Sequence, residues 1–519
     1  MKPFVREHVN AVLFALALLA GALLRAPAWF TVIGQNAYSK ILWYDEAYSA
    51  FFASRPLLET IRLSGNDTTP GLFAVLLSFW SRIFGDGVGA LAAFPFLLSL
   101  AGIVCVFFLG RELFDSRTGV AAALLLALNP LHVKYATEIR AYNLLACLAA
   151  LSLLFAWRYL CDRRAADAAA WGAIAVLGMY THYVFAALLA VEAVFMGAAF
   201  ATESRRELKR FVRVLGGIGL AFVPQMLLFR RWGDFFASVG ATSNLVRGYG
   251  HGGLLTIPTF FSTLAFGQEQ SHPMTPAGLW FSTVAGVIIM IGILAYILRA
   301  RRELATRYLV FVLFVGIAAL MAGKLLYSPR YFLVFAPAFA VLAGRMLSGL
   351  RPAAFLTAFA ICAAALGAPL WRSYAVHPAY AFTYYAPAFA DRIAEQAEPG
   401  DLVLADHYTD ILFRRYYRGP APVVTFFPRD GRNVEDMAER FRTFDYDFIG
   451  RRDLPTLQRL TSGYRRIWTV DYEPQSSSLQ DPTGIKRRWL EGHFFRIDRI
   501  EFPAETAQQK IVLYFYQRI

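Results

Sequence analysis

The sequence predicts a polytopic α-helical membrane domain followed by a soluble α/β domain. Of 519 residues, 57% are hydrophobic and only 17% are charged, and the mean hydropathy of +0.44 is too high for a soluble globular protein. Apolar runs of about 17–25 residues recur between residues 9 and 371, each long enough to cross the hydrocarbon layer. Beyond residue 372, short apolar runs alternate with charged, amphipathic stretches. We therefore expect a membrane domain at residues 1–371 and a second domain at residues 372–519.

The net charge of +14 is placed as in a membrane protein rather than in a nucleic-acid-binding protein. Basic residues cluster in the short gaps between apolar runs, and such loops mark the cytoplasmic side of a membrane. These clusters are Lys2 and Arg6; Arg111 and Arg117; Arg158, Arg163 and Arg164; Arg205, Arg206, Lys209, Arg210 and Arg213; Arg299, Arg301, Arg302 and Arg307; Arg345 and Arg351.

Placing every cluster inside gives about eleven spans, with the amino terminus inside and the carboxyl-terminal domain outside. The spans are expected near residues 9–28, 88–110, 119–131, 141–160, 169–181, 183–201, 214–229, 277–298, 308–323, 331–349 and 354–371. The apolar segment 71–84 is too short to cross and is expected to lie in the interface. Residues 29–87 then form one large outer loop.

The first apolar run is predicted to be an uncleaved span. Residues 11–24 are followed by Ala26-Pro27-Ala28, which loosely matches the A-x-A site of a signal peptide. Pro27 inside that motif and the acidic pair that soon follows favour retention of the segment.

Asp45 and Glu46 form an acidic pair on the large outer loop, where the chain leaves the membrane. An ionisable side chain deep in a bilayer costs about 2.5–3.5 kcal/mol, so such groups usually serve a function. The alternative is an ordinary solvated loop. Because adjacent side chains point about 100° apart on a helix and about 180° apart on a strand, the two carboxylates cannot address one atom.

Other polar residues of the predicted outer face gather at a few loops. They are Asp67; His132, Lys134, Tyr135, Glu138, Arg140 and Tyr142; His182; Lys324, Arg330 and Tyr331; and several charged residues between 230 and 276. Each has a simpler interpretation: Lys134 and Glu138 have the spacing of a helical ion pair, Arg140 could be a snorkelling anchor, and His182 an interfacial side chain. Taken together, these residues place cations beside carboxylates at the predicted outer face.

This combination suits group transfer from a phosphate-linked donor. Cations offset the charge that develops on a departing phosphate, and the planar fork of arginine matches phosphate oxygens. A carboxylate can take the proton of an incoming hydroxyl, a contribution typically worth about 10²–10⁴-fold in rate.

Five ordered segments over residues 9–350 carry a family resemblance: WYDEAYSA, DTTPGLFAVLLSFWSRIFGD, GRELFDSRTGVAAALLLALNPLHVKYATEIRAY, YTHYVF and SPRYFLVFAPAFAVLAG. The chain resembles the GT-C glycosyltransferases of the protein O-mannosyltransferase-like branch, which includes the bacterial aminoarabinose and galacturonic acid transferases of lipid A. The resemblance implies an inverting transfer from a polyprenyl-phosphate sugar at the periplasmic face, with no nucleotide sugar. The sequence accordingly has no GxGxxG or P-loop pattern.

The resemblance also implies roles for individual residues. Asp45 matches the first-loop aspartate and is expected to be the general base, with Glu46 positioning the acceptor. Arg140 and Arg330, with Lys134 and Lys324 as weaker candidates, are expected to contact the donor phosphate. Asp67 and the Thr68–Gly71 turn resemble a donor-site segment, but Thr69-Pro70-Gly71 stands where relatives often have two prolines, which leaves the role of Asp67 open. The remaining expected substrate contacts are Tyr135, Glu138, His182 and Tyr331.

The mechanism requires no cofactor. Asp45, Asp67, His251 and Glu269 are of the residue types that bind a divalent ion, so a metal stays possible. Cys105, Cys147, Cys161 and Cys362 show neither a disulfide framework nor metal-ligand spacing.

The carboxyl-terminal domain is predicted to be a three-layer α/β sandwich. The runs DLVLAD, PVVTFF, RRIWTVDY and KIVLYFYQ read as strands, and helices are expected near residues 386–398, 408–418, 434–442, 453–463 and 482–491. Arg414, Arg415, Tyr416 and Tyr417 form either an acceptor-binding surface or an ordinary helix face.

The competing function is a transporter or flippase of lipid-linked sugars. A transporter typically has repeated halves and broken helices, and the sequence shows neither. A glycan ligase or polymerase is a closer alternative and would rely on arginine and histidine without Asp45. A non-catalytic scaffold leaves the acidic pair unexplained. The acceptor can be a lipid, a glycan or a protein.

Overall fold

The structure is a computed structural model that contains two compact units, which are described separately. Unit 1 contains residues 1–34 and 64–376, and unit 2 contains residues 35–63 and 377–519. The structure describes residues 3–33, 42, 44–65, 67, 69–229, 256–267, 276–300, 302–322, 329–351, 353–355, 357, 386–406, 409–426, 449–473, 481, 483–503 and 510–518. The predicted division at residue 371 stays a prediction, and residues 35–63 of the predicted outer loop belong to unit 2.

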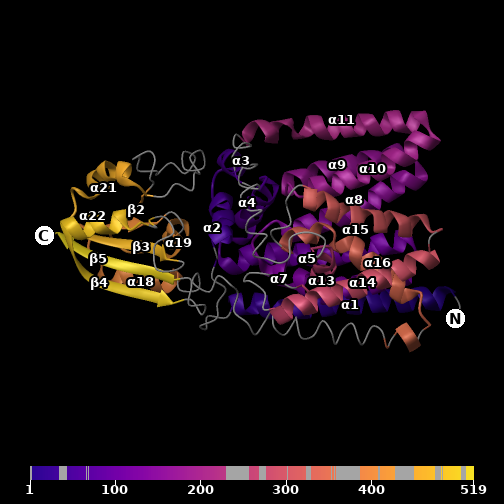
Figure 1. Cartoon of the computed structure of the whole chain (residues 1–519), viewed down its shortest axis with the longest axis horizontal. Helices are drawn as coiled ribbons and strands as arrows, with labels where there is room; N and C mark the ends of the chain where they lie inside the picture. Colours follow the sequence, from indigo (N-terminus) through magenta and orange to yellow (C-terminus); the bar gives the residue numbers. More distant parts are fainter. Residues whose placement is uncertain are drawn as a thin grey trace. The chain divides into compact units, whose positions relative to one another are not determined.

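Unit 1 is a bundle of long helices lying side by side (Figure 1). Its elements are α1 (Pro3–Ile33), α4 (Leu72–Phe84), α5 (Val88–Leu113), α6 (Ser116–Leu128), α7 (Pro130–Lys134), η1 (Tyr135–Thr137), α8 (Tyr142–Asp162), α9 (Ala165–Thr181), α10 (Phe185–Glu203), α11 (Arg205–Leu228), α13 (Thr256–Phe266), α14 (Pro276–Ala300), α15 (Leu304–Ala322), η2 (Pro329–Val334) and α16 (Ala336–Ser348). This helical content confirms a polytopic α-helical membrane protein.

Seven helices within the described residues are long and apolar enough to cross a membrane, or eight if one bent pair counts as a single span. The predicted number of about eleven spans stays a prediction, and most of the last one, 354–371, lies outside the described residues. Segment 71–84 forms α4, which is too short to be among the seven.

One predicted span differs from the structure. The run 119–131 was expected to be continuous, but α6 ends at Leu128 and meets the short segment 130–137 at an angle of 56°. Pro130 is the physical reason, because it has no N–H to donate to the carbonyl of Leu126 four residues earlier. The Asn129 side chain instead accepts a hydrogen bond from the His132 N–H at 3.0 Å and begins a new helix. The predicted continuous span 119–131 is therefore wrong, and Pro130 is the residue that could have indicated the break.

The predicted basic loops share one end of unit 1. Ion pairs join Glu112 to Arg158 at 2.8 Å, and Arg345 to Glu303 at 2.6 Å and to Asp115 at 3.5 Å. A further ion pair joins Arg163 to Glu203. Loops that are far apart in the sequence therefore meet at the same end of the bundle, as the distribution of positive charge requires.

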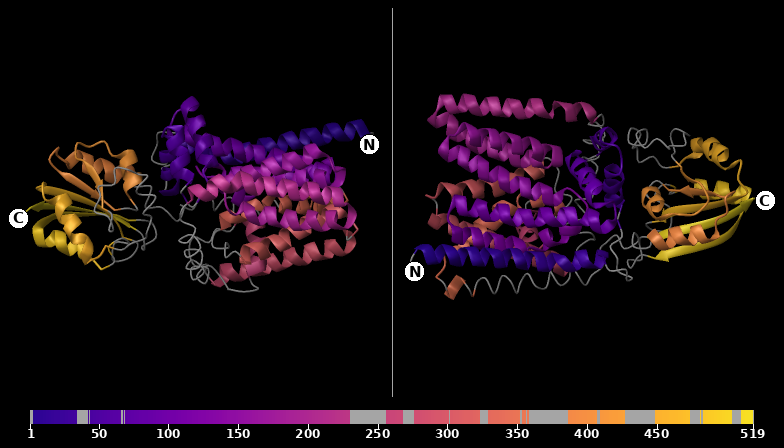
Figure 2. Two further views of the ribbon diagram at one scale, coloured as in Figure 1. Left: turned by 90° about the horizontal axis from the view of Figure 1, so that it is seen from above. Right: turned by 180° about the vertical axis from the view of Figure 1, so that it is seen from behind.

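Unit 2 contains a mixed sheet with helices packed against it (Figure 2). Its five strands lie in the order β2-β1-β3-β5-β4. The strands are β1 (Leu402–Ala405), β2 (Val423–Thr425), β3 (Arg466–Glu473), β4 (Phe494–Pro503) and β5 (Lys510–Arg518), and the helices are α2 (Tyr44–Ala53), α3 (Leu57–Gly65, whose last two residues belong to unit 1), α18 (Ala386–Gln396), α19 (Asp410–Tyr416), η4 (Arg451–Asp453), α21 (Leu454–Thr461) and α22 (Ile485–His493). β1 pairs in parallel with β2 and β3, and β5 pairs antiparallel with β3 and β4.

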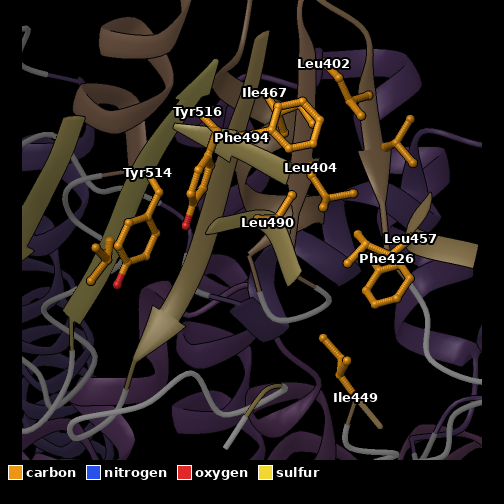
Figure 3. Close-up of a cluster of buried hydrophobic side chains, with 12 residues drawn as sticks. Leu402, Leu404, Phe426, Ile449, Leu457, Ile467, Leu490, Phe494, Tyr514 and Tyr516 are labelled. Atoms are coloured by element: carbon orange, nitrogen blue, oxygen red, sulfur yellow. The ribbon is translucent and has the colours of Figure 1, made fainter. Parts of the chain in front are cut away.

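Helices cover both faces of this sheet, which confirms the predicted sandwich. On one face, Leu404, Ile467 and Tyr514 pack with Leu457 of α21 and Leu490 of α22 (Figure 3). On the other, Phe389 of α18 contacts Phe413 of α19 and Phe502 of β4, with ring centroids 6.0 Å apart in both pairs. All four predicted strands are present, β4 was missed, and the predicted helix 434–442 lies outside the described residues.

Candidate functional site

Three cationic side chains converge in unit 1 from two separate parts of the chain. Lys134 ends α7, Arg140 lies just before α8, and Arg330 comes from η2, nearly two hundred residues later. The Arg330 guanidinium lies 5.5 Å from the ring centroid of Tyr142 and 5.9 Å from that of Tyr331. Such stacking holds a guanidinium in place while leaving its N–H groups directed to other partners.

The cluster is rich in positive charge. Lys134 interacts electrostatically with the carboxylate of Glu138 and with Arg330, and the charges of Arg140 and Arg330 both act on His182. All three cations and Glu138 are half-buried. Three cations and the carboxylate of Glu138 thus share this region, a combination of charges that suits the binding of an anion. The predicted Lys134–Glu138 ion pair does not lie along one helix, because α7 ends at Lys134 and a 3₁₀ turn follows.

A second segment reaches the cluster from the predicted outer loop. Arg140 donates a hydrogen bond to the Thr69 hydroxyl at 3.3 Å, so the turn before α4 lies beside the cationic group. The charge of Asp67 acts on Tyr183, at the turn between α9 and α10. Tyr135 is buried and stacks edge-on against Tyr142, with ring centroids 5.0 Å apart. Tyr135 therefore packs beside the tyrosine on which Arg330 stacks.

His182 lies in the turn between α9 and α10 and faces the same group. Its ring centroid lies 4.9 Å from that of Tyr331 and 6.0 Å from that of Tyr142. Burial, together with the nearby positive charges of Arg140 and Arg330, lowers the pKa of His182 to about 3, so the ring is neutral at physiological pH. Because Nδ1 accepts the Val184 N–H at 3.1 Å, the ring proton is assigned to Nε2.

A buried arginine that sequence reasoning missed contacts the end of α6 and the start of α7. Arg25 of α1 is fully buried and donates to the Ala127 carbonyl at 2.9 Å and to the Leu126 carbonyl at 3.4 Å. It also contacts His132 Nδ1 at 2.8 Å and the Ser99 hydroxyl at 2.6 Å. Arg25 thus donates to carbonyls of the last turn of α6, next to the break before Pro130, where the Leu126 carbonyl also accepts the Asn129 N–H at 3.2 Å. An ionisable residue within an apolar run is a signal that could have revealed it.

The acidic pair belongs to unit 2, in the first turn of α2. Asp45 is half-buried, whereas Glu46 is 1% exposed. The buried Leu42 N–H, just before α2, donates to the Tyr416 hydroxyl of α19 at 3.1 Å, and the charge of Glu46 acts on the same tyrosine. Burial and this carboxylate raise the pKa of Tyr416 against the opposing effect of the Leu42 N–H. Tyr416 therefore contacts the segment that carries the acidic pair. Sequence reasoning did not predict this contact.

Several predicted residues lie outside the described part of the chain. They are Lys324 of the donor-phosphate set, Thr68 of the predicted donor-site turn, and His251 and Glu269 of the possible metal ligands. Among the described residues, no group of three or more His, Cys, Asp or Glu side chains is placed to hold a metal ion.

Comparisons with known proteins identify a matching family and solved structures of similar fold. Residues 68–228 match the family described as dolichyl-phosphate-mannose-protein mannosyltransferase. The structure is similar to that of ArnT from Cupriavidus metallidurans in the apo state, with 14% identity, 98% of both chains covered and a TM-score of 0.62. The fold is that of the GT-C glycosyltransferases. The resemblance predicted from the sequence is thereby confirmed.

Two further structures share the GT-C fold and contain a lipid phosphate. ArnT from the same organism bound to undecaprenyl phosphate is 16% identical, with 97% of both chains covered and a TM-score of 0.59. The archaeal oligosaccharyltransferase AglB from Archaeoglobus fulgidus, in complex with an inhibitory peptide and a dolichol-phosphate, is 14% identical over 90% of this chain and 70% of that chain, with a TM-score of 0.50. A search of curated proteins finds no match to the sequence.

Proposed function

We propose that this protein is an inverting glycosyltransferase that moves a sugar from a polyprenyl-phosphate donor to a hydroxyl acceptor. It acts at the periplasmic face of a bacterial inner membrane, with the sheet domain in the periplasm. The proposal rests on one observation above all: half-buried Lys134, Arg140 and Arg330 converge in unit 1. Solved proteins of the same fold are named as bound to undecaprenyl phosphate or to a dolichol-phosphate, which is the kind of anion that such a cluster suits.

In this mechanism the cationic cluster binds the donor phosphate. Arg140 and Arg330 contact its oxygens with their N–H groups, and Lys134 adds a point charge. As the acceptor oxygen bonds to the anomeric carbon, the bond from that carbon to the phosphate oxygen breaks, and polyprenyl phosphate leaves with the electron pair. The arginines offset the charge that develops on the leaving group. Lys324 belongs to the predicted set and stays a weaker candidate.

Asp45 takes the proton of the acceptor hydroxyl. Of the acidic pair it is the more exposed member, since Glu46 is 1% exposed and its charge acts on Tyr416. Glu46 accordingly helps to hold α2 in place and so positions the acceptor. Asp67, Tyr135, Glu138, His182 and Tyr331 complete the substrate-binding set, and the Nε2–H of His182 is a neutral donor suited to a sugar hydroxyl or a phosphate oxygen. The chemistry requires no cofactor, and a divalent ion stays possible.

Donor binding tests this proposal directly. Arg330→Gln and Arg140→Gln are each expected to weaken binding of undecaprenyl phosphate to the purified full-length protein by about 10–100-fold, because each removes a charge-assisted contact. Arg117→Gln is the matched control: Arg117 lies 5.1 Å from the ring centroid of Phe355 but outside the cluster. Equal affinities for wild type, both cluster variants and the control would overturn the phosphate assignment.

A further inference from the structure

Helices α14 and α15 of unit 1 enclose an apolar groove. It has a volume of about 300 Å³ and is lined by Ile297 of α14 and by Val310, Phe311 and Phe314 of α15, with Arg307 in its lining as well. Consecutive helices of a bundle usually pack along their length, but within the described residues α15 packs mainly against α10 and α16, and α14 against α13. A hollow thus remains between α14 and α15, running along α15 from its first turn.

Three exposed arginines lie at the end of this groove where α14 passes into α15: Arg299, Arg302 and Arg307. The one nearby carboxylate of the described chain, Glu303, is already engaged, because it accepts from Arg345 at 2.6 Å and from the Thr306 hydroxyl at 2.9 Å. Among the residues that the structure describes, none of the three arginines has an ion pair. Their positive charge is therefore uncompensated at the edge of an apolar hollow.

Membrane topology by itself explains only part of this arrangement. Short loops on one side of a membrane protein carry excess arginine, and Arg205 and Arg206 at the start of α11 are exposed in the same way. The groove does not follow from that tendency. Buried in a bilayer, an apolar hollow next to an α-helix is filled by acyl chains, and a basic site beside it selects an anionic head group.

We propose that the α14–α15 groove is a binding site for an anionic phospholipid of the surrounding bilayer. One acyl chain lies along α15 against Phe311 and Phe314, and the head-group phosphate is bound by Arg307 and Arg302. The site lies at the end of unit 1 where the basic loops gather, and it is separate from the donor-phosphate cluster of Arg140 and Arg330. It takes part in no chemical step.

Lipid binding to the delipidated full-length protein, followed by native mass spectrometry, tests this assignment. Wild type is expected to bind phosphatidylglycerol in preference to phosphatidylcholine. The double variant Arg302→Gln/Arg307→Gln is expected to lower phosphatidylglycerol affinity by about 30-fold, since each arginine near an anionic lipid contributes about one factor of five. Val310→Trp fills the groove while keeping every arginine, and it is expected to reduce binding as well.

The control is the double variant Arg205→Gln/Arg206→Gln, which removes the same charge where no part of the groove lies. It is expected to retain wild-type affinity within about twofold. Equal loss in the control and the groove variants would overturn the proposal, as would equal binding of the two phospholipids by wild type. Displacement of phosphatidylglycerol by undecaprenyl phosphate from Arg330→Gln protein would assign the groove to polyprenyl phosphate instead and would also contradict the proposal.

Discussion

Tyr416→Phe should loosen the helix that carries the acidic pair. The Leu42 N–H is fully buried and donates to the Tyr416 hydroxyl at 3.1 Å, across 374 residues of sequence. Phenylalanine keeps the ring but removes the acceptor. Leaving a buried N–H without a partner costs about 1–3 kcal/mol, which is about 5–150-fold in the equilibrium for local opening. Amides at the start of α2, next to Asp45, are expected to exchange faster by that factor.

Hydrogen exchange with mass spectrometry of the full-length protein measures this effect over residues 42–53. Tyr417→Phe is the matched control, because its hydroxyl accepts the buried Ala421 N–H at 3.1 Å within the same region of unit 2. That variant loses an equivalent bond without touching α2 and should leave exchange of α2 unchanged. Wild-type exchange in Tyr416→Phe, or equal acceleration in both variants, would refute the role given to Tyr416.

Two buried polar groups away from the site give further predictions. Lys486→Met should destabilise unit 2 by about 3–5 kcal/mol, because it leaves buried Asp471 without the ammonium group 2.6 Å away; hydrogen exchange of β3 amides measures the loss, and unchanged exchange would contradict it. Burial lowers the pKa of Lys486, but the carboxylates of Asp471 and Asp406 outweigh it and raise the pKa above 10.5, so this difference should be constant from neutral pH to pH 10.5 and shrink as the pH rises further. In unit 1, Glu192→Leu should cost about 1–3 kcal/mol, because buried Glu192 accepts from Ser152, Trp171 and Tyr308. Glu192→Gln keeps an acceptor and should cost less, and equal thermal stability of the two variants in detergent would argue against the hydrogen-bonded role.

Sequence patterns predicted the elements that depend on local apolar runs. Four strands of unit 2 were found because their residues are buried on both sides of the sheet, as in β1, where all four residues are buried. β4 was missed because it is an edge strand with Arg496, Asp498 and Glu501 exposed among its apolar residues. It therefore lacks the continuous apolar run that identified the others.

The arrangement of the site depends on long-range contacts that no local pattern encodes. Candidate cations were recognisable because charge at a membrane boundary is costly, but nothing in the sequence showed that Arg330 stacks on Tyr142. The hydrogen bond from the Leu42 N–H to Tyr416 likewise joins segments of unit 2 that are 374 residues apart, and the composition around Leu42 does not indicate it. Arg25 was missed because its partners are carbonyls about a hundred residues away, which no local pattern around Arg25 indicates.

The central claim is that Asp45 removes the acceptor proton while a separate cationic cluster binds the donor. The most direct test is turnover of a polyprenyl-phosphate sugar by Asp45→Asn, measured together with donor affinity on the same preparation. We predict that turnover falls by about 10²–10⁴-fold while donor affinity stays within about twofold of wild type. Turnover equal to that of wild type, with donor binding intact, would contradict the assignment of Asp45 as the base.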